Sequence, residues 1–328
     1  MVAYDKPWLP IEAQIDKLAS RGVEIGDEAD AAKLLRAVGY YRLTGYLYPF
    51  RRSERYDDEG RTRVRVLSRY RDGTTMAHAA KIIDFDRALR ILVLDGIERV
   101  EVSLRMQLGH TLGAQSPFAH LDSATFVPPF TTEYTDPISG LPTSKHLQWI
   151  AKVNARRDAS DEAFVAHFRD KYDGQMPIWA LTEILELGHL SRLYSGLNNS
   201  LATAIAHSYG APTKRVMASW IASLNYVRNV AAHHARLFNR KLVVAPSRPP
   251  VGDVPLLDHL RDDSRAKAVY GVYNALAVTA YLLRTIDRDS GWPERVLHLA
   301  RTFPGIPSFT LDTMGAHPRW KRLELWAP

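Results

Sequence analysis

The chain of 328 residues contains no cysteine, so neither a disulfide framework nor a thiolate metal site is available to it. It also lacks any run of about eighteen apolar residues, the length that a membrane-spanning helix needs. Residues 1–8 hold no apolar stretch of the kind that forms a secretion signal. We therefore expect a cytoplasmic protein with no membrane partner. The length allows one large domain or two ordinary ones.

Acidic residues are outnumbered, with 36 Asp and Glu against 43 Lys and Arg, which gives a formal charge of +7. Because phosphate neutralisation drives nucleic-acid affinity, a polyanion is the first partner class to consider. The excess is greatest in residues 51–71, where eight arginines face four acidic residues. Arginine can bond two phosphate oxygens at once. A solvated loop or hairpin explains this segment equally well, and the sequence leaves both interpretations open.

Strand-like alternation is scarce and helical periodicity dominates. Apolar residues recur at steps of three and four in residues 11–38, 82–112, 147–168, 178–208, 214–240 and 265–287. Only residues 62–67 alternate, which predicts an edge strand or hairpin arm. Proline and glycine predict irregular segments at residues 128–142 and 246–255. The pattern favours an all-α protein with an N-terminal helical portion and basic hairpin or loop at 1–75 and a helical domain at 76–328, or one continuous body.

The segment 214–240 is predicted to be one amphipathic helix. Its apolar face would hold Val216, Trp220, Leu224, Val227, Ala231 and Phe238. The opposite stripe would hold Asn225, Asn229, His233, Arg236 and Arg240, with no acidic residue between its ends. Arg228 borders this stripe, whereas His234 points toward the apolar edge. Such a stripe offers donors and positive charge to an anion, so Arg236 and Arg240 are candidate RNA-binding residues.

These residue types support cleavage of RNA by its own 2′-hydroxyl. A histidine can move protons at neutral pH, and an arginine can stabilise the negative charge that develops on phosphorus. Asn229 could orient the phosphate or the histidine. Neither a metal nor a cofactor is needed. On an ideal helix, His233 lies about 140° around the axis and about 7.5 Å along it from Arg228. One phosphate could contact both side chains only if it lay over the arc between them, or if a second copy of the helix completed the site.

A second pair with the same spacing, Arg105 and His110, occurs in the segment 82–112. Glu101 stands four residues before Arg105, as in an ordinary helical ion pair. Arg105 is therefore either a further RNA-binding residue or one half of that ion pair.

The sequence RNVAAHHARLFNR at residues 228–240 resembles the signature of Abi-like abortive-infection proteins of the AbiD/AbiF type. Shorter matches extend the resemblance over most of the chain: KPWL at 6–9, GYYRLTGY at 39–46, FDRALR at 85–90, MPIW at 176–179 and GHLS at 188–191. The resemblance implies a HEPN helical domain, whose motif has four to six residues between an arginine and a histidine. Carried onto this chain, the catalytic residues are Arg228, Asn229 and His233, followed by His234.

HEPN ribonucleases commonly pair two such helices across a homodimer, so the resemblance also implies a homodimer. We expect a metal-independent endoribonuclease that serves as an abortive-infection or toxin–antitoxin toxin, with RNA as substrate and an RNA or protein antitoxin as restraint. The alternative is a non-catalytic RNA-binding or sensor module in phage defence.

Overall fold

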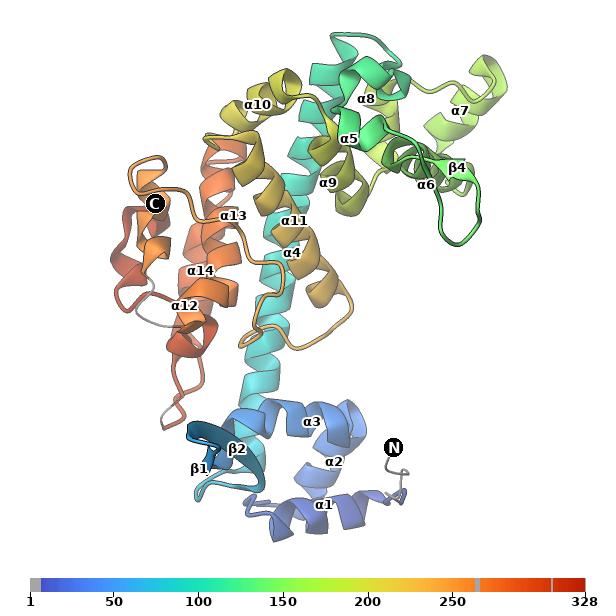
Figure 1. Ribbon diagram of the computed structural model, residues 1–328. Coiled ribbons are helices and arrows are strands. Elements are labelled where there is room, and N and C mark those ends of the chain that lie inside the picture. The colour runs from blue at the N-terminus through green and yellow to red at the C-terminus, as the bar shows by residue number, and fades with distance from the viewer. Residues whose placement is uncertain (1–6, 263–265, 308, 328) are drawn as a thin grey trace. The chain divides into compact units, whose positions relative to one another are not determined.

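The computed structural model describes residues 7–262, 266–307 and 309–327 (Figure 1). Helices make up most of these residues, and the strands form two small antiparallel hairpins, so the all-α prediction is confirmed. The chain divides into two compact units. The first holds the residues up to Leu89 together with Arg301–Thr310, and the second holds Arg90–Ala300 with the residues from Leu311. None of the described helices is both long and apolar enough to cross a membrane.

The first unit consists of three helices, a hairpin and the start of a long helix. The elements are α1 (Ile11–Ser20), α2 (Glu28–Val38), α3 (Tyr40–Leu47), β1 (Arg51–Asp58), β2 (Arg61–Tyr70) and the first part of α4 (Met76–Gly113). Leu18, Leu35 and Leu43 are buried in its core. The hydroxyl of Tyr46 donates to the buried carboxylate of Asp86 at 2.6 Å, which fixes α3 against α4.

The basic segment at residues 51–71 is the β1–β2 hairpin, which confirms the strand predicted at 62–67. Its two-residue turn places Glu59 and Gly60 at φ 53° and 76°, the conformation that matches the twist of a tight hairpin. Arg63 pairs with Asp58 at 2.6 Å, and Nε of Arg65 donates to Glu54 at 2.8 Å. Most side chains of both strands are exposed, so the arginines of this hairpin lie at the surface.

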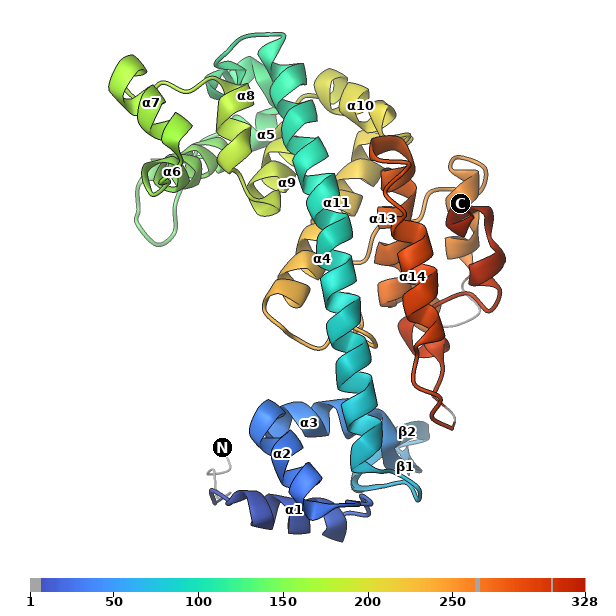
Figure 2. The ribbon, with the colours of Figure 1, turned by 180° about the vertical axis from the view of Figure 1, so that it is seen from behind.

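The second unit is a helical assembly around α4, α9, α11 and α13. Its helices are the rest of α4, α5 (Pro128–Thr131), α6 (Lys145–Asp158), α7 (Ala163–Tyr172), α8 (Ile178–Leu181), α9 (Leu187–Gly196), α10 (Asn199–Ser208), α11 (Lys214–Ala232), α12 (Ala266–Tyr270), α13 (Val272–Ile286) and α14 (Trp292–Arg301). Helix α13 is apolar nearly all round and is correspondingly buried. Figure 2 shows α14 alongside the part of α4 in this unit, where Trp292 donates to the carbonyl of Leu92 at 2.9 Å.

The periodicity located the helices but not their ends. The predicted helices at 11–38, 147–168, 178–208 and 265–287 are each divided. Turns with Gly22 and Gly26 at positive φ separate α1 from α2, Gly271 separates α12 from α13, and short irregular turns interrupt the other two. The predicted loop at 128–142 holds α5 and the hairpin of β3 (Tyr134–Thr135) with β4 (Pro142–Thr143), whereas residues 246–254 are irregular as expected. Lys6 and residue 265, the predicted start of the last helix, lie outside the described residues.

Candidate functional site

The helix that carries the Arg-x4-His motif ends inside the motif. Helix α11 stops at Ala232, His233 is its C-cap, and His234 takes the left-handed conformation with φ 57°. The amide of His234 donates to the carbonyl of Ala231 and that of Ala235 to the carbonyl of Val230, both at 3.0 Å. These two bonds form a Schellman motif, which satisfies carbonyls that the helix end would otherwise leave unpaired. The prediction of one helix over residues 214–240 is therefore wrong.

This ending breaks the predicted anion-facing stripe. Arg236 and Arg240 follow the helix and do not continue its face. Nε of Arg240 donates to the carbonyl of Arg236 at 2.9 Å, and its guanidinium reaches the hydroxyl of Tyr226 on α11 at 3.5 Å. Phe238 is fully buried. The prediction that His234 leans toward the apolar edge is also wrong, because the left-handed turn exposes its side chain.

A buried carboxylate, Glu101 on α4, connects two arginines of the candidate site. Glu101 is only 6% exposed, and its Oε1 lies 2.8 Å from Nη2 of Arg105, which confirms the predicted ion pair. Its other oxygen, Oε2, lies 3.8 Å from Nη2 of Arg228 on α11. Nε of Arg105 also donates to the carbonyl of Leu185 at 3.0 Å. One acidic side chain therefore brings both motif arginines to the same place.

Sequence reasoning identified Glu101 only as a partner for Arg105. A stronger signal was present, because Glu101 falls between Val100 and Leu104 on the same stripe as Ile97 and Leu108, all of which are buried. An acidic residue on an apolar stripe must find cationic or hydrogen-bonding partners inside the protein. That signal points to more than one partner for Glu101.

The asparagines of α11 contact the same region. Nη1 of Arg228 donates to Oδ1 of its neighbour Asn229 at 3.2 Å. Asn225 lies one turn earlier against Gly188 of α9, where an added Cβ would stand 3.5 Å from the Asn225 amide oxygen. Asn229 thus orients Arg228 directly, and Asn225 fits the close approach of α9 to α11.

The motif histidines are exposed to solvent, whereas the arginines are partly buried. The side chains of His233 and His234 are exposed at the end of α11, and His110 is exposed on α4. Within the described part of the chain, no hydrogen bond or ion pair joins either α11 histidine to Arg228 or Arg105. The end of α11 therefore presents two solvent-facing imidazoles, and Arg228, one turn or more earlier, pairs with the buried Glu101. Among the described residues, no group of three or more His, Asp or Glu side chains is placed to hold a metal ion.

Comparison with known proteins gives one match. A family model described as Abi-like protein matches residues 33–239, which is more than half of the chain and includes Glu101, Arg105 and Arg228. No curated protein and no solved structure matches the chain.

Proposed function

The chain belongs to the Abi-like protein family, and from this premise we propose that it acts in phage defence as a metal-independent endoribonuclease of the HEPN type. The observation that carries the proposal is the composition of the α11 end. Arg228 is oriented by Glu101 and Asn229, and His233 and His234 follow it with exposed imidazoles. An anchored guanidinium followed closely in sequence by accessible histidines is a set suited to phosphodiester cleavage.

In the proposed reaction, the imidazole of His233 removes the proton from a ribose 2′-hydroxyl. The 2′-oxygen attacks the adjacent phosphorus, and the bond from phosphorus to the 5′-oxygen breaks. A second imidazole, that of His234 or of His233 in a second copy, returns a proton to the departing 5′-oxygen. The products are a 2′,3′-cyclic phosphate and a 5′-hydroxyl, so no external nucleophile is consumed.

The guanidinium of Arg228 would bind the non-bridging phosphate oxygens, whose negative charge grows in the transition state. Its side chain is 28% exposed, so a phosphate can reach it without displacement of the helix. Arg105 is tied to Glu101 and to the Leu185 carbonyl and is 23% exposed. We therefore assign to Arg105 a supporting positive charge, with Arg228 as the principal contact.

A second candidate function is that of a non-catalytic RNA-binding or sensor module. The exposed arginines of the β1–β2 hairpin favour it, because they offer phosphate contacts that need no reactive histidine. Both candidates predict RNA binding, and only the first predicts cleavage.

The deciding experiment incubates the full chain with total RNA in EDTA and maps the new ends. We expect the wild type to produce 2′,3′-cyclic phosphate ends, and Arg228→Ala and His233→Ala to bind RNA with at least a hundredfold slower cleavage, since acid–base catalysis contributes about 10²–10⁴-fold. Matched controls are Arg215→Ala, at the other end of α11, and His207→Ala, both exposed. Wild-type protein that binds RNA but never cuts it would establish the second candidate instead.

We also propose that the active form is a homodimer restrained by an RNA or protein antitoxin. Light scattering during the cleavage assay tests the first part. A strict monomer with full activity would contradict a composite site.

A further inference from the structure

A cavity of about 440 Å³ lies in the second unit among residues that the proposed reaction does not use. Its walls come from the short turn η2 (Ala119–Leu121) with Phe118 before it, from α6, and from the segment 173–176 that follows α7. Small-molecule sites typically enclose roughly 300–1,000 Å³. The cavity is therefore large enough for a ligand of a few ring systems.

One wall of the cavity is polar and structurally fixed. Asn154 and Arg157 stand one turn apart on α6, so both face the same side. Nη1 of Arg157 donates to the carbonyl of Gly174 at 3.2 Å, which ties the helix to the segment 173–176. In that segment Asp173 is the C-cap of α7 and adopts the left-handed conformation, with φ 52° and ψ 39°, in which Asp is enriched among residues other than glycine.

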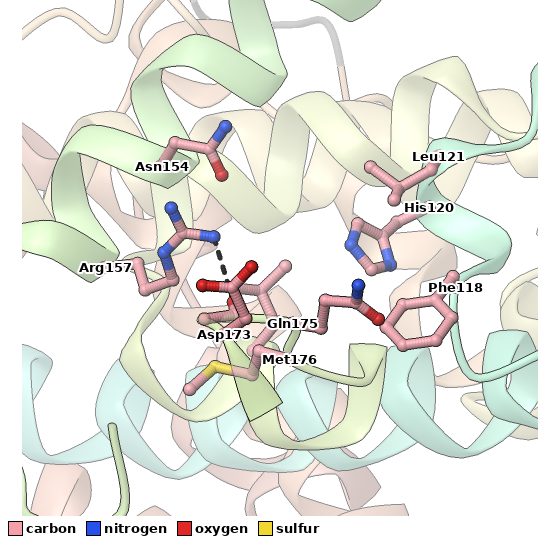
Figure 3. A pocket seen from close by; sticks show the side chains of 10 residues that line it. Phe118, His120, Leu121, Asn154, Arg157, Asp173, Gln175 and Met176 are labelled. Atoms are coloured by element: carbon pink, nitrogen blue, oxygen red, sulfur yellow. Dashed lines mark hydrogen bonds between the residues drawn. The ribbon is translucent and has the colours of Figure 1, made fainter. Parts of the chain in front are cut away.

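The opposite wall holds the phenyl ring of Phe118 and a buried histidine, His120. Figure 3 shows Phe118, His120 and Leu121 on the side away from Asn154 and Arg157, with Gln175 between the two groups. His120 is only 5% exposed, and its Nδ1 has no hydrogen-bond partner among the described residues. Burial, with a smaller contribution from His146, lowers the pKa of His120 to about 4. The imidazole is thus neutral near pH 7 and keeps one donor and one acceptor.

We propose that this cavity binds a nucleotide with a single phosphate, either free or as an unpaired unit of an RNA strand. The guanidinium of Arg157 suits the phosphate. The amides of Asn154 and Gln175 carry both donors and acceptors, as the edges of nucleobases require. The ring of Phe118 offers a surface on which a base can stack.

The charge of the cavity restricts the ligand further. Arg157 is the one cation and Asp173 the one anion among the residues of its lining, and Arg157 also pairs with the neighbouring Asp158 at 2.9 Å, so the cavity carries no excess of positive charge. Additional phosphates would meet the Asp173 carboxylate without a second cation to offset it. The same carboxylate can accept hydrogen bonds from ribose hydroxyls or an exocyclic amino group. A nucleoside monophosphate unit fits this balance better than a di- or triphosphate.

The test is calorimetric titration of the full chain with the four nucleoside 5′-monophosphates, with inorganic phosphate and uncharged nucleosides as separate arms. A short single-stranded RNA distinguishes a free nucleotide from a unit of a strand. We expect saturable binding of at least one monophosphate or of the RNA, weakened at least tenfold by Arg157→Gln and by Gln175→Trp. The first removes a charge-assisted hydrogen bond, and the second fills the cavity with an indole.

Arg169→Gln, on the exposed side of α7, is the matched control for loss of charge, and thermal melts verify that each variant is folded. The titrations measure binding and need no cleavage, so failure of the ribonuclease proposal leaves this one testable. Binding of inorganic phosphate alone, binding that neither cavity variant weakens, or no binding by any of the probes would overturn the assignment.

Discussion

Replacement of Glu101 by glutamine keeps the size of the side chain and removes its charge. The carboxylate pairs with Arg105 at 2.8 Å and with Arg228 at 3.8 Å, and it is 6% exposed. Glu101→Gln therefore leaves two guanidinium groups without their shared anion. We expect the free energy of unfolding to fall, and the orientation of Arg228 to loosen as well.

The size of the effect lies between two known limits. Loss of one partner of a buried ion pair costs about 3–5 kcal/mol, whereas exposed pairs contribute about 0–1 kcal/mol. The side chains of Arg105 and Arg228 are 23% and 28% exposed, so water can solvate the orphaned cations in part. We therefore expect Glu101→Gln to lower the free energy of unfolding by about 2 kcal/mol.

Urea denaturation of the wild type, Glu101→Gln and the control Glu98→Gln measures this difference. Glu98 is exposed on the same helix, so its replacement should change stability by no more than about 0.5 kcal/mol. A double-mutant cycle then divides the effect between the two arginines. The coupling of Glu101 to Arg105 should exceed that to Arg228, because only the shorter contact is a hydrogen bond. Equal stability of the two glutamine variants would refute the role assigned to Glu101.

Three further predictions follow from local geometry. An added Cβ at Gly96 would stand 2.5 Å from the Trp292 ring, so Gly96→Ala should lower the free energy of unfolding by about 1–3 kcal/mol in thermal melts. The control is Gly45→Ala, whose added Cβ has no neighbour within 4 Å. The pKa of His120 is about 4 in the folded protein and about 6.5 in the unfolded chain. The free energy of unfolding should therefore be highest above pH 6.5 and fall by up to about 3 kcal/mol toward pH 4. Urea denaturation of His120→Gln should show a smaller loss over the same pH range. His234→Gly relieves the left-handed strain and should raise the free energy of unfolding by about 1 kcal/mol, whereas His234→Ala should not.

The helical character of the chain was predictable, because each helix buries one apolar face and this leaves apolar residues at steps of three and four in the sequence. The helix ends were less predictable. A Schellman ending usually shows itself by a glycine, and here the left-handed position holds His234, which the sequence gives no reason to separate from a helical residue. Phe238 falls on the apolar face that a longer helix would have, and it is buried although it follows the end of α11.

The residues of the candidate site could be predicted from the sequence, but the contacts that hold Arg228 in place could not. Arg105 and Arg228 are 123 positions apart in sequence, and their approach depends on how α4 packs in the second unit, which local patterns do not encode. The i,i+4 ion pair of Glu101 with Arg105 could be predicted because both residues share one helix. The contact of Glu101 with Arg228 required the tertiary structure.

The early end of α11 changes which residues one copy of the chain can bring to the proposed site. The Cα position of His233 is set by the helical residues before it, so His233 still lies about 140° round from Arg228 although it is the C-cap. Arg236 and Arg240 no longer share that face, so they cannot supply the missing contacts from the same helix. In the proposed reaction, one copy supplies His233 as the base and has only His234 to return the proton, whereas a homodimer would supply a second His233. We therefore expect cleavage to depend on dimerisation.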